Sequence, residues 1–201
     1  MTTCDTIENT ARLMFRNFRN VVTRRPHSFH YDTQLELFYT EEHGVKHYFE
    51  NRQRGFSLYR YGLKKRGRAI AESYCLDLIQ FDDEDIVIDC GANYGDLFLF
   101  FAEKIKPENY ITFEPGPNEH RTLMHNAPNS THFQIALSNE NTIKEFYLCS
   151  RYADSSLIEN KNTVAKIAVQ SSTLENEIRK LEIDRPIKLL KLEAEGFEPE
   201  I

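Results

Sequence analysis

The fold of this chain is decided by the stretch Val87-Ile88-Asp89-Cys90-Gly91-Ala92-Asn93-Tyr94-Gly95-Asp96. Residues 85–89 are short, apolar and β-branched, which is typical of a buried parallel strand. The glycines that follow allow a sharp turn and a close approach of the backbone to a ligand. Residues 97–105 then predict a helix. A strand that runs through a glycine-rich turn into a helix presents free helix N–H groups to a ligand.

Strands and helices alternate on the C-terminal side of this turn. The pattern predicts strands at 110–113, 132–137, 144–149 and 187–192 and helices at 118–126 and 173–181. Because this alternation is typical of βαβ units, we expect residues 81–201 to form an α/β domain with a doubly wound sheet and helices on both faces.

The first 80 residues are predicted to form a separate helical region. Residues 1–25 alternate short apolar groups with arginine, which predicts a helix that ends before Pro26. Two further helices are predicted, at 31–52 and 66–80. We therefore expect a helical N-terminal region, 1–80, followed by the α/β domain, 81–201.

Composition limits the class of protein. The chain has 201 residues, of which 40% are hydrophobic and 28% are charged, which favours one folded domain with an appendage. The longest apolar run, Leu97 to Ala102, is too short to span a membrane, and the N-terminus shows no secretory signal. The four cysteines are widely spaced, with no Cys-x-x-Cys pair. We therefore expect a reduced, cytoplasmic protein rather than a membrane, disulfide-rich or zinc-ribbon protein.

Charge is distributed unevenly along the chain. The formal net charge is -6, yet residues 1–80 carry 13 Lys and Arg against 9 Asp and Glu, while residues 81–201 carry 12 against 22. The acidic half would repel a polyanion, so we expect no nucleic-acid partner. The basic residues, including Arg24, Arg25 and the run 64–68, are interpreted as a solvated face, with docking of a partner as the alternative.

The residues around the glycine-rich turn indicate the kind of ligand. Gly91 and Gly95 follow Asp89 in a pattern that differs from the three-glycine dinucleotide fingerprint, which disfavours a nicotinamide cofactor. An acid at this position repels a pyrophosphate but suits an ammonium or sulfonium group. Glu114 ends the next strand, at a position where an acid can accept bonds from ribose hydroxyls. Together these features predict the cofactor S-adenosylmethionine.

Several motifs resemble those of the FkbM-type methyltransferases. They are the stretch 87–96, Phe113-Glu114-Pro115, Ala136-Leu137-Ser138, Ser155-Ser156-Leu157 and Thr173-Leu174-Glu175. The block 189–198 is similar to that family's Lys-Ile-Asp-Val-Glu-Gly block, with Glu193 in place of its Asp. The resemblance covers residues 81–201. It implies a Rossmann-like fold and transfer of a methyl group, usually to a hydroxyl of a natural product, sugar or glycan.

The resemblance also implies which residues bind the cofactor. Asp89, Gly91, Asn93 and Gly95 are expected to border the methionine moiety, Glu114 to hold the ribose and the residues around Ala136 to line the adenine, with Ala92 and Pro115 completing the set. A buried strand end is the alternative interpretation of Ala136. No metal site is expected.

Catalysis is assigned to the end of the strand at 187–192. Methyl transfer to an alcohol requires aligned reactants and a group that accepts the hydroxyl proton. Glu193 lies at the C-terminal end of this strand, where open α/β sheets bind ligands, and shares one strand face with Lys191. We predict that Glu193 positions the acceptor or acts as general base, with Lys191 setting its charge state. A carboxylate that binds the cofactor amine or a neighbouring loop is the alternative.

Two histidines, the C-terminal end of the chain and the overall function carry the remaining predictions. His43 and His47 are predicted to be surface histidines rather than metal ligands. The fold of the resembled family continues beyond Ile201, so C-terminal strands are expected to be missing, which leaves residues 188–192 at an open sheet edge unless an oligomer partner covers it. The predicted function is methylation of a hydroxyl on a small molecule, sugar or glycan. The alternative is a non-catalytic module that docks a partner through its basic helical head.

Overall fold

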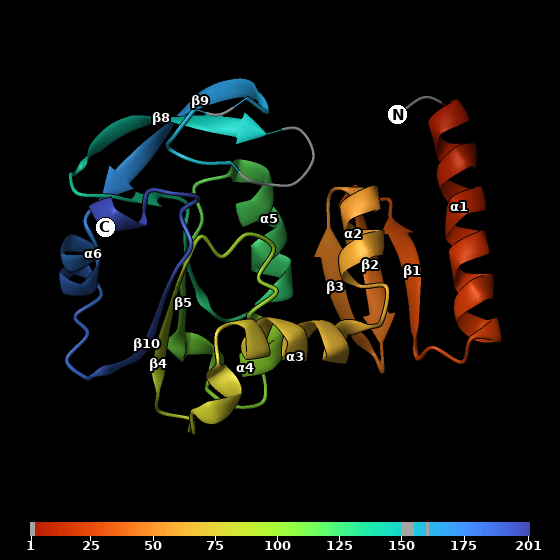
Figure 1. Cartoon of the computed structure of the whole chain (residues 1–201), viewed down its shortest axis with the longest axis horizontal. Helices are drawn as coiled ribbons and strands as arrows, with labels where there is room; N and C mark the ends of the chain where they lie inside the picture. The colour runs from red at the N-terminus through yellow and green to blue at the C-terminus, as the bar shows by residue number, and fades with distance from the viewer. Residues whose placement is uncertain (1–2, 150–154, 160) are drawn as a thin grey trace.

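The computed structural model describes residues 3–149, 155–159 and 161–201. Figure 1 shows a smaller part at one end, with helix α1 (Thr3–Val22) against three strands, and a larger part at the other end around a parallel sheet. Helix α1 bears out the predicted N-terminal helix, of which residues 1–2 lie outside the described residues.

The smaller part contains an antiparallel sheet that the sequence analysis did not predict. Strands β1 (His27–Asp32), β2 (Leu37–Glu42) and β3 (Val45–Phe49) pair in the order β1-β2-β3, and α2 (Arg52–Leu58) follows. The prediction of a helix over 31–52, and of a wholly helical region over 1–80, was therefore wrong. His43 and Gly44 both have positive φ, 52° and 83°, which is the two-residue turn that joins the strands of a hairpin.

Aromatic side chains explain why these residues form strands. Phe38 lies opposite Phe49, and Tyr39 lies opposite Tyr48. Their rings lie 6.1 and 5.3 Å apart, and such cross-strand pairs stabilise a sheet. Phe29 adds a third fully buried ring to this core. Phe38 and Tyr39 are consecutive, as are Tyr48 and Phe49, so the two pairs lie on opposite faces of the sheet. Aromatic residues suit such a pleated surface better than a helix.

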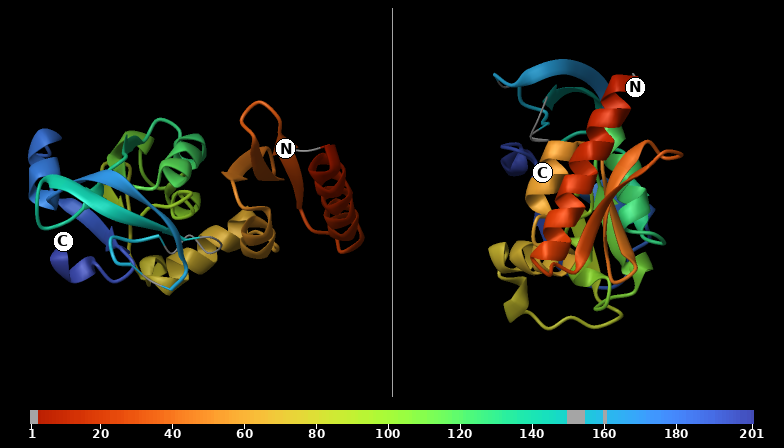
Figure 2. Two further views of the ribbon diagram at one scale, coloured as in Figure 1. Left: turned by 90° about the horizontal axis from the view of Figure 1, so that it is seen from above. Right: turned by 90° about the vertical axis from the view of Figure 1, so that its right-hand side faces the viewer.

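Helix α3 (Leu63–Ser73) links the two parts, as the view from above shows in Figure 2. It begins after Gly62, whose φ is 96°, and therefore starts three residues before the predicted helix at 66–80. Cys75 adopts a left-handed conformation that ends the helix, and only a short 3-10 turn, Leu76–Leu78, follows. A domain boundary at residue 80 stays a prediction.

The larger part is built on a four-stranded parallel sheet in the order β10-β4-β5-β6. Its strands are β4 (Ile86–Cys90), β5 (Tyr110–Phe113), β6 (Thr131–Phe133) and β10 (Ile187–Leu192). Its helices are α4 (Phe98–Phe101), α5 (Pro117–Asn126) and α6 (Leu174–Lys180). This arrangement is compatible with a Rossmann-like fold, and β10 lies at an edge of the sheet.

Side chains that point to alternate faces of β4 divide the core into two layers. Val87 packs with the apolar residues of α3, α4 and α5 on one face. Ile86 and Ile88 pack on the other face, against Leu174 and Ile178 of α6. Helices therefore cover both faces of the sheet, as the sequence predicts, and the carboxyl ends of β4, β5 and β10 open on one edge.

A second sheet stands beside the first and contains β7 (Ala136–Leu137), β8 (Thr142–Cys149) and β9 (Thr163–Ser172) in the order β7-β9-β8. The single strand predicted at 132–137 was wrong, because β6 and β7 belong to different sheets. The strand predicted at 144–149 is present as β8, but it pairs antiparallel with β9 rather than within the parallel sheet. None of the described helices is long and apolar enough to cross a membrane.

Candidate active site

A polar cleft of about 280 Å³ lies at the carboxyl ends of β4, β5 and β10, and a smaller apolar pocket adjoins it. The predicted residues that line the cleft are Asp89, Gly91, Ala92, Asn93, Glu114, Lys191 and Glu193. Pro115 and Ala136 line the pocket together with Leu137, Phe146 and Leu157. Glu114 and Gly91 belong to both linings, so the two spaces meet at these residues.

The turn after β4 forms the floor of the cleft. Gly91 has a φ of +70°, and a Cβ atom there would lie 1.9 Å from the backbone oxygen of Glu193. Glycine is therefore required for the turn to pack against the end of β10. Gly95, with a φ of +78°, lines neither space, and its N–H donates to the carbonyl of Ala92 at 2.8 Å. Its part in cofactor binding stays a prediction.

Glu114 lies between the cleft and the pocket and is only 6% exposed. Its carboxylate accepts hydrogen bonds from the backbone N–H groups of Asn93 and Gly116, both at 2.8 Å. Burial, together with the neighbouring charge of Glu119, raises the pKa of Glu114 to about 7. The group therefore changes charge near neutral pH, and a ligand that donates hydrogen bonds to it favours its ionised form.

Lys191 is a buried cation that holds the ends of β10 and β4 together. Its Nζ lies 3.0 Å from Oδ1 of Asp89 and 3.2 Å from Oε2 of Glu193. It also donates to the carbonyls of Cys90 and Gly91 at 3.1 and 2.8 Å. Burial lowers the pKa of Lys191, but the two carboxylates outweigh it and leave the pKa above its usual value. Much of the charge of Asp89 is thus compensated within the protein.

Glu193 stands at the rim of the cleft, with its side chain 53% exposed. The hydroxyl of Tyr74, on the residue that follows α3, donates to its Oε2 at 2.7 Å. Burial raises the pKa of Glu193, but Lys191 and the Tyr74 hydrogen bond outweigh burial and lower it below its usual value. Glu193 is therefore ionised at neutral pH. The contact with Lys191 agrees with the predicted shared strand face.

Asp96 ends the turn and connects the cleft to the smaller part. Its Oδ1 accepts from Nε2 of His47 at 2.8 Å and from the hydroxyl of Tyr59 at 2.6 Å, and its Oδ2 accepts from Nε of Arg66 at 2.7 Å. Burial raises the pKa of Asp96, but His47 and Arg66 more than offset burial and hold the pKa well below its usual range. The prediction of a surface position for His47 was wrong, because this side chain is 1% exposed and packs against Tyr59.

The cleft also contains charged residues that the sequence analysis did not select. Arg54, Arg66, Asp96 and Glu119 all line it. The basic run 64–68 was interpreted as a solvated face, but Arg66 points inward from α3 to Asp96. The sequence signal that could have indicated this role is the position of Arg66 in the first turn of the helix that precedes β4 and its glycine-rich turn.

The charges of the cleft favour a cationic ligand. Six carboxylates line it, those of Asp89, Asp96, Glu114, Glu119, Glu193 and Glu195, against the three cations Arg54, Arg66 and Lys191. An excess of carboxylates in a confined space attracts positive groups. Among the residues that the structure describes, no group of three or more His, Cys, Asp or Glu side chains could hold a metal ion.

Comparison with curated proteins gave no match. The family model described as the methyltransferase FkbM domain matches residues 89–201, which begin at Asp89 within β4 and include the apolar pocket and most of the residues that line the cleft. This match covers more than half of the chain. The chain therefore belongs to the FkbM methyltransferase family.

Proposed function

We propose that this methyltransferase uses S-adenosylmethionine to methylate a hydroxyl group of a small molecule, sugar or glycan. The observation that carries the proposal is the junction at Glu114, where a polar cleft with excess negative charge meets an apolar pocket. A nucleoside that carries a cationic side chain has the same sequence of groups. Its apolar base, its ribose and its charged end each meet a matching environment.

The residues of the two spaces suit the parts of this cofactor. Glu114 would accept hydrogen bonds from the ribose hydroxyls, since its carboxylate lies where cleft and pocket meet. Pro115 and Ala136 would contact the adenine within the apolar pocket. The turn at Gly91 and Asn93 would border the methionine moiety, because the close packing of Gly91 leaves the backbone open to the cleft.

Glu193 is the residue proposed to bind the acceptor, and Lys191 sets its charge state. When bound, S-adenosylmethionine supplies an electrophilic methyl group on its sulfonium sulfur. The Glu193 carboxylate would accept a hydrogen bond from the acceptor hydroxyl and hold its oxygen toward the cleft. Because Lys191 and Tyr74 lower the pKa of Glu193, it is a weak base. Positioning of the acceptor is thus favoured over abstraction of its proton.

The compartment is part of the same proposal. Among the described cysteines, Cys75 and Cys90 are free thiols. Free thiols are typical of proteins in a reducing environment, so we propose a cytoplasmic location.

The test is isothermal titration of the chain with S-adenosylhomocysteine, the product of the cofactor, and with NAD. We expect micromolar binding of S-adenosylhomocysteine alone. Glu114→Ala is expected to weaken this binding by about 2 kcal/mol, the scale of hydrogen bonds lost from a charged group. Glu103→Ala, a matched change at an exposed carboxylate after α4, should leave it unchanged. A folded chain that binds NAD instead would contradict the proposed cofactor and favour a nicotinamide-dependent enzyme. A folded chain that binds neither ligand would also contradict it and favour the non-catalytic docking module.

A further inference from the structure

Helix α1 faces the protein mainly with polar side chains, beside the half-buried Leu13. Asn17 donates to the carbonyl of Phe29 at 2.8 Å and accepts from the N–H of Phe29 at 2.7 Å. Asn20, which is buried, donates to the carbonyl of His27 at 3.0 Å. These amide contacts attach the helix to β1, which it lies alongside in Figure 2. The orientation is the reverse of an ordinary surface helix, whose apolar stripe faces the core.

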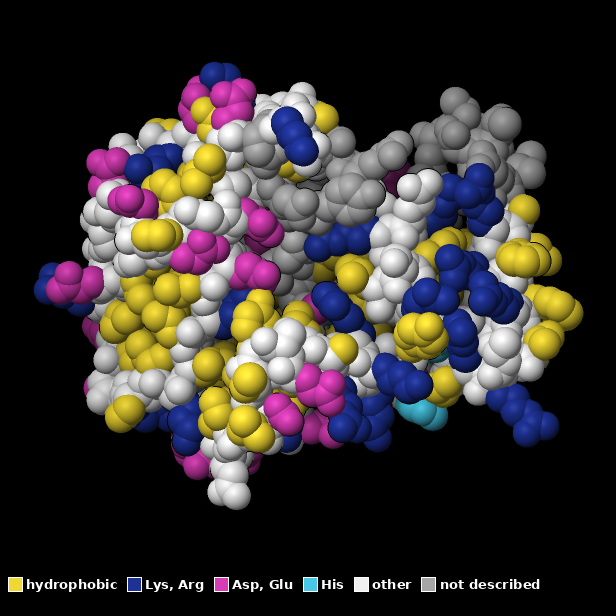
Figure 3. Space-filling model, in the orientation of Figure 1, with side chains coloured by type: hydrophobic (Ala, Val, Ile, Leu, Met, Phe, Trp, Pro, Cys, Tyr) yellow, Lys and Arg dark blue, Asp and Glu magenta, His cyan; other side chains and the backbone are white. Residues whose placement is uncertain are grey.

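The apolar side of α1 therefore points away from the protein. Its large residues are each between 65% and 75% exposed: Met14, Phe15, Phe18, Val21 and Val22. At 3.6 residues per turn these positions fall on one arc of the helix, opposite Asn20. In Figure 3 hydrophobic side chains gather at the end of the molecule that carries α1, beside a cluster of Lys and Arg. An exposed patch of this kind, next to charged residues, marks an interaction surface.

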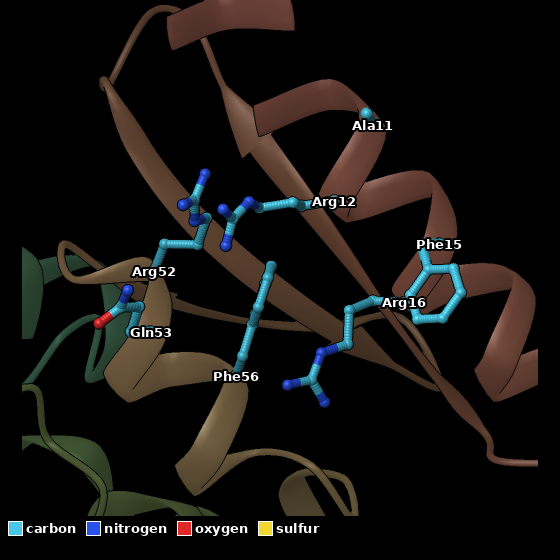
Figure 4. A pocket seen from close by; sticks show the side chains of 7 residues that line it. All are labelled: Ala11, Arg12, Phe15, Arg16, Arg52, Gln53 and Phe56. Carbon is cyan, nitrogen blue, oxygen red and sulfur yellow. The ribbon is translucent and has the colours of Figure 1, made fainter. Parts of the chain in front are cut away.

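A groove of about 460 Å³ between α1 and α2 runs along one flank of this apolar arc. Arg12 and Arg16 of α1 and Arg52 of α2 line it, and Figure 4 shows their side chains around Phe56. Burial lowers the pKa of Arg16, and the neighbouring charges of Arg19 and others lower it further. Three arginines and no acidic side chain are among the described residues that line the groove, so its lining carries a net positive charge.

The segment of α1 and β1 carries an excess of positive charge. Residues 3–31 contain five arginines against the two acidic residues Asp5 and Glu8. A second copy of this face would bring arginines against arginines, which opposes self-association through it. A polyanion such as RNA would satisfy the arginines but leave the apolar arc in water. A surface that is anionic outside and apolar beneath matches both the arginines and the apolar arc.

We propose that α1 and the arginine groove dock on an anionic membrane surface. The helix lies in the plane of the interface, with Phe15 and Phe18 entering the boundary between headgroups and acyl chains. Arg16 and Arg19 of α1 bind lipid phosphates. Helix α1 does not cross the bilayer, since it is not apolar enough to span one.

The test is flotation of the chain with vesicles of phosphatidylcholine alone and of phosphatidylcholine mixed with an equal amount of phosphatidylglycerol. We expect binding to the mixed vesicles only, and weaker binding as salt is raised. Phe15→Ser with Phe18→Ser is expected to reduce binding at least tenfold. The matched control is Ile143→Ser with Val164→Ser, which changes equally exposed residues of β8 and β9 and should leave binding unchanged.

The contribution of charge is tested separately. Arg16→Gln with Arg19→Gln should reduce binding at least tenfold and weaken its salt dependence, whereas Lys104→Gln with Lys161→Gln removes the same charge elsewhere and should not. Circular dichroism checks that each variant is folded. The proposal would be overturned if the chain bound neither vesicle or if all variants bound equally. It would also be overturned by self-association that is lost in the phenylalanine variant, or by capture of an RNA oligonucleotide without vesicle binding.

Discussion

Cofactor binding is expected to weaken as pH falls from 8 to 6, because one buried carboxyl controls it. The pKa of Glu114 is raised to about 7 in the ligand-free chain. Ribose hydroxyls donate hydrogen bonds to a carboxylate, so the ligand selects the ionised form. Each pH unit below a pKa removes a factor of ten from the ionised fraction. The Kd for S-adenosylhomocysteine should therefore be roughly tenfold higher at pH 6 than at pH 8.

Titration calorimetry at pH 6, 7 and 8 measures this dependence. Repeating the pH 6 titration in buffers of different ionisation enthalpy counts the protons released, and we expect about one per site. The variant Glu119→Gln provides a sharp control, since the charge of Glu119 helps to raise the pKa of Glu114. In this variant the loss of affinity should move to lower pH.

Two results would refute this reasoning. A wild-type Kd that stays constant between pH 6 and 8 would show that the ligand does not engage an ionised Glu114. A Glu114→Gln variant that keeps the full pH dependence would assign the titration to another group. If the account is right, this variant binds more weakly than wild type and without the pH dependence.

The other predictions concern stability and catalysis. Asp96→Asn should lower the free energy of unfolding by about 3 kcal/mol in urea titrations, since it leaves buried partners uncompensated. Because the pKa of Asp96 is held low, this contribution to stability is full above the ordinary value of 3.8 and is lost as pH falls below it. The difference in unfolding free energy between wild type and variant should therefore narrow in acid. Gly91→Ala should destabilise the chain by more than 1 kcal/mol, because its Cβ would lie 1.9 Å from the Glu193 oxygen, and a wild-type urea midpoint would contradict this. In a methyl-transfer assay with an identified acceptor, Glu193→Gln should raise KM and lower kcat less than tenfold, whereas a loss of roughly a hundredfold or more would indicate a general base.

Local sequence patterns were sufficient for the parallel sheet. The buried run before Gly91 and the strand at 187–192 were found with correct positions, because apolar β-branched runs bounded by turn residues have few alternatives. Helix α6 was also found, because its sequence is amphipathic. In the structure Thr173 caps it by accepting a hydrogen bond from the N–H of Asn176 at 3.2 Å.

Patterns that depend on distant partners were not sufficient. The hairpin at His43 and Gly44 was missed because short aromatic segments fit a helix or a strand until their cross-strand partners are known. Residues 132–137 were joined into one strand because nothing local shows that β6 and β7 belong to different sheets.

For the same reason, the strand-end residues of the site were predicted, whereas the contacts of Asp96 were not. Asp89, Gly91 and Glu114 were brought together correctly, because the carboxyl ends of neighbouring parallel strands meet at one edge. The environment of Asp96 was not foreseen, since His47 and Arg66 lie 49 and 30 residues away along the chain. His47 lies on β3, which was predicted as part of a helix, and Arg66 was interpreted as part of a solvated face.

The most direct test of the account is a crystal structure of the chain with S-adenosylhomocysteine. We predict that the ribose hydroxyls lie within hydrogen-bond distance of the Glu114 carboxylate, that the adenine contacts Pro115 and Ala136, and that the methionine moiety lies over the turn at Gly91. A ligand bound with its adenine outside the apolar pocket, or with its ribose away from Glu114, would contradict the proposed site.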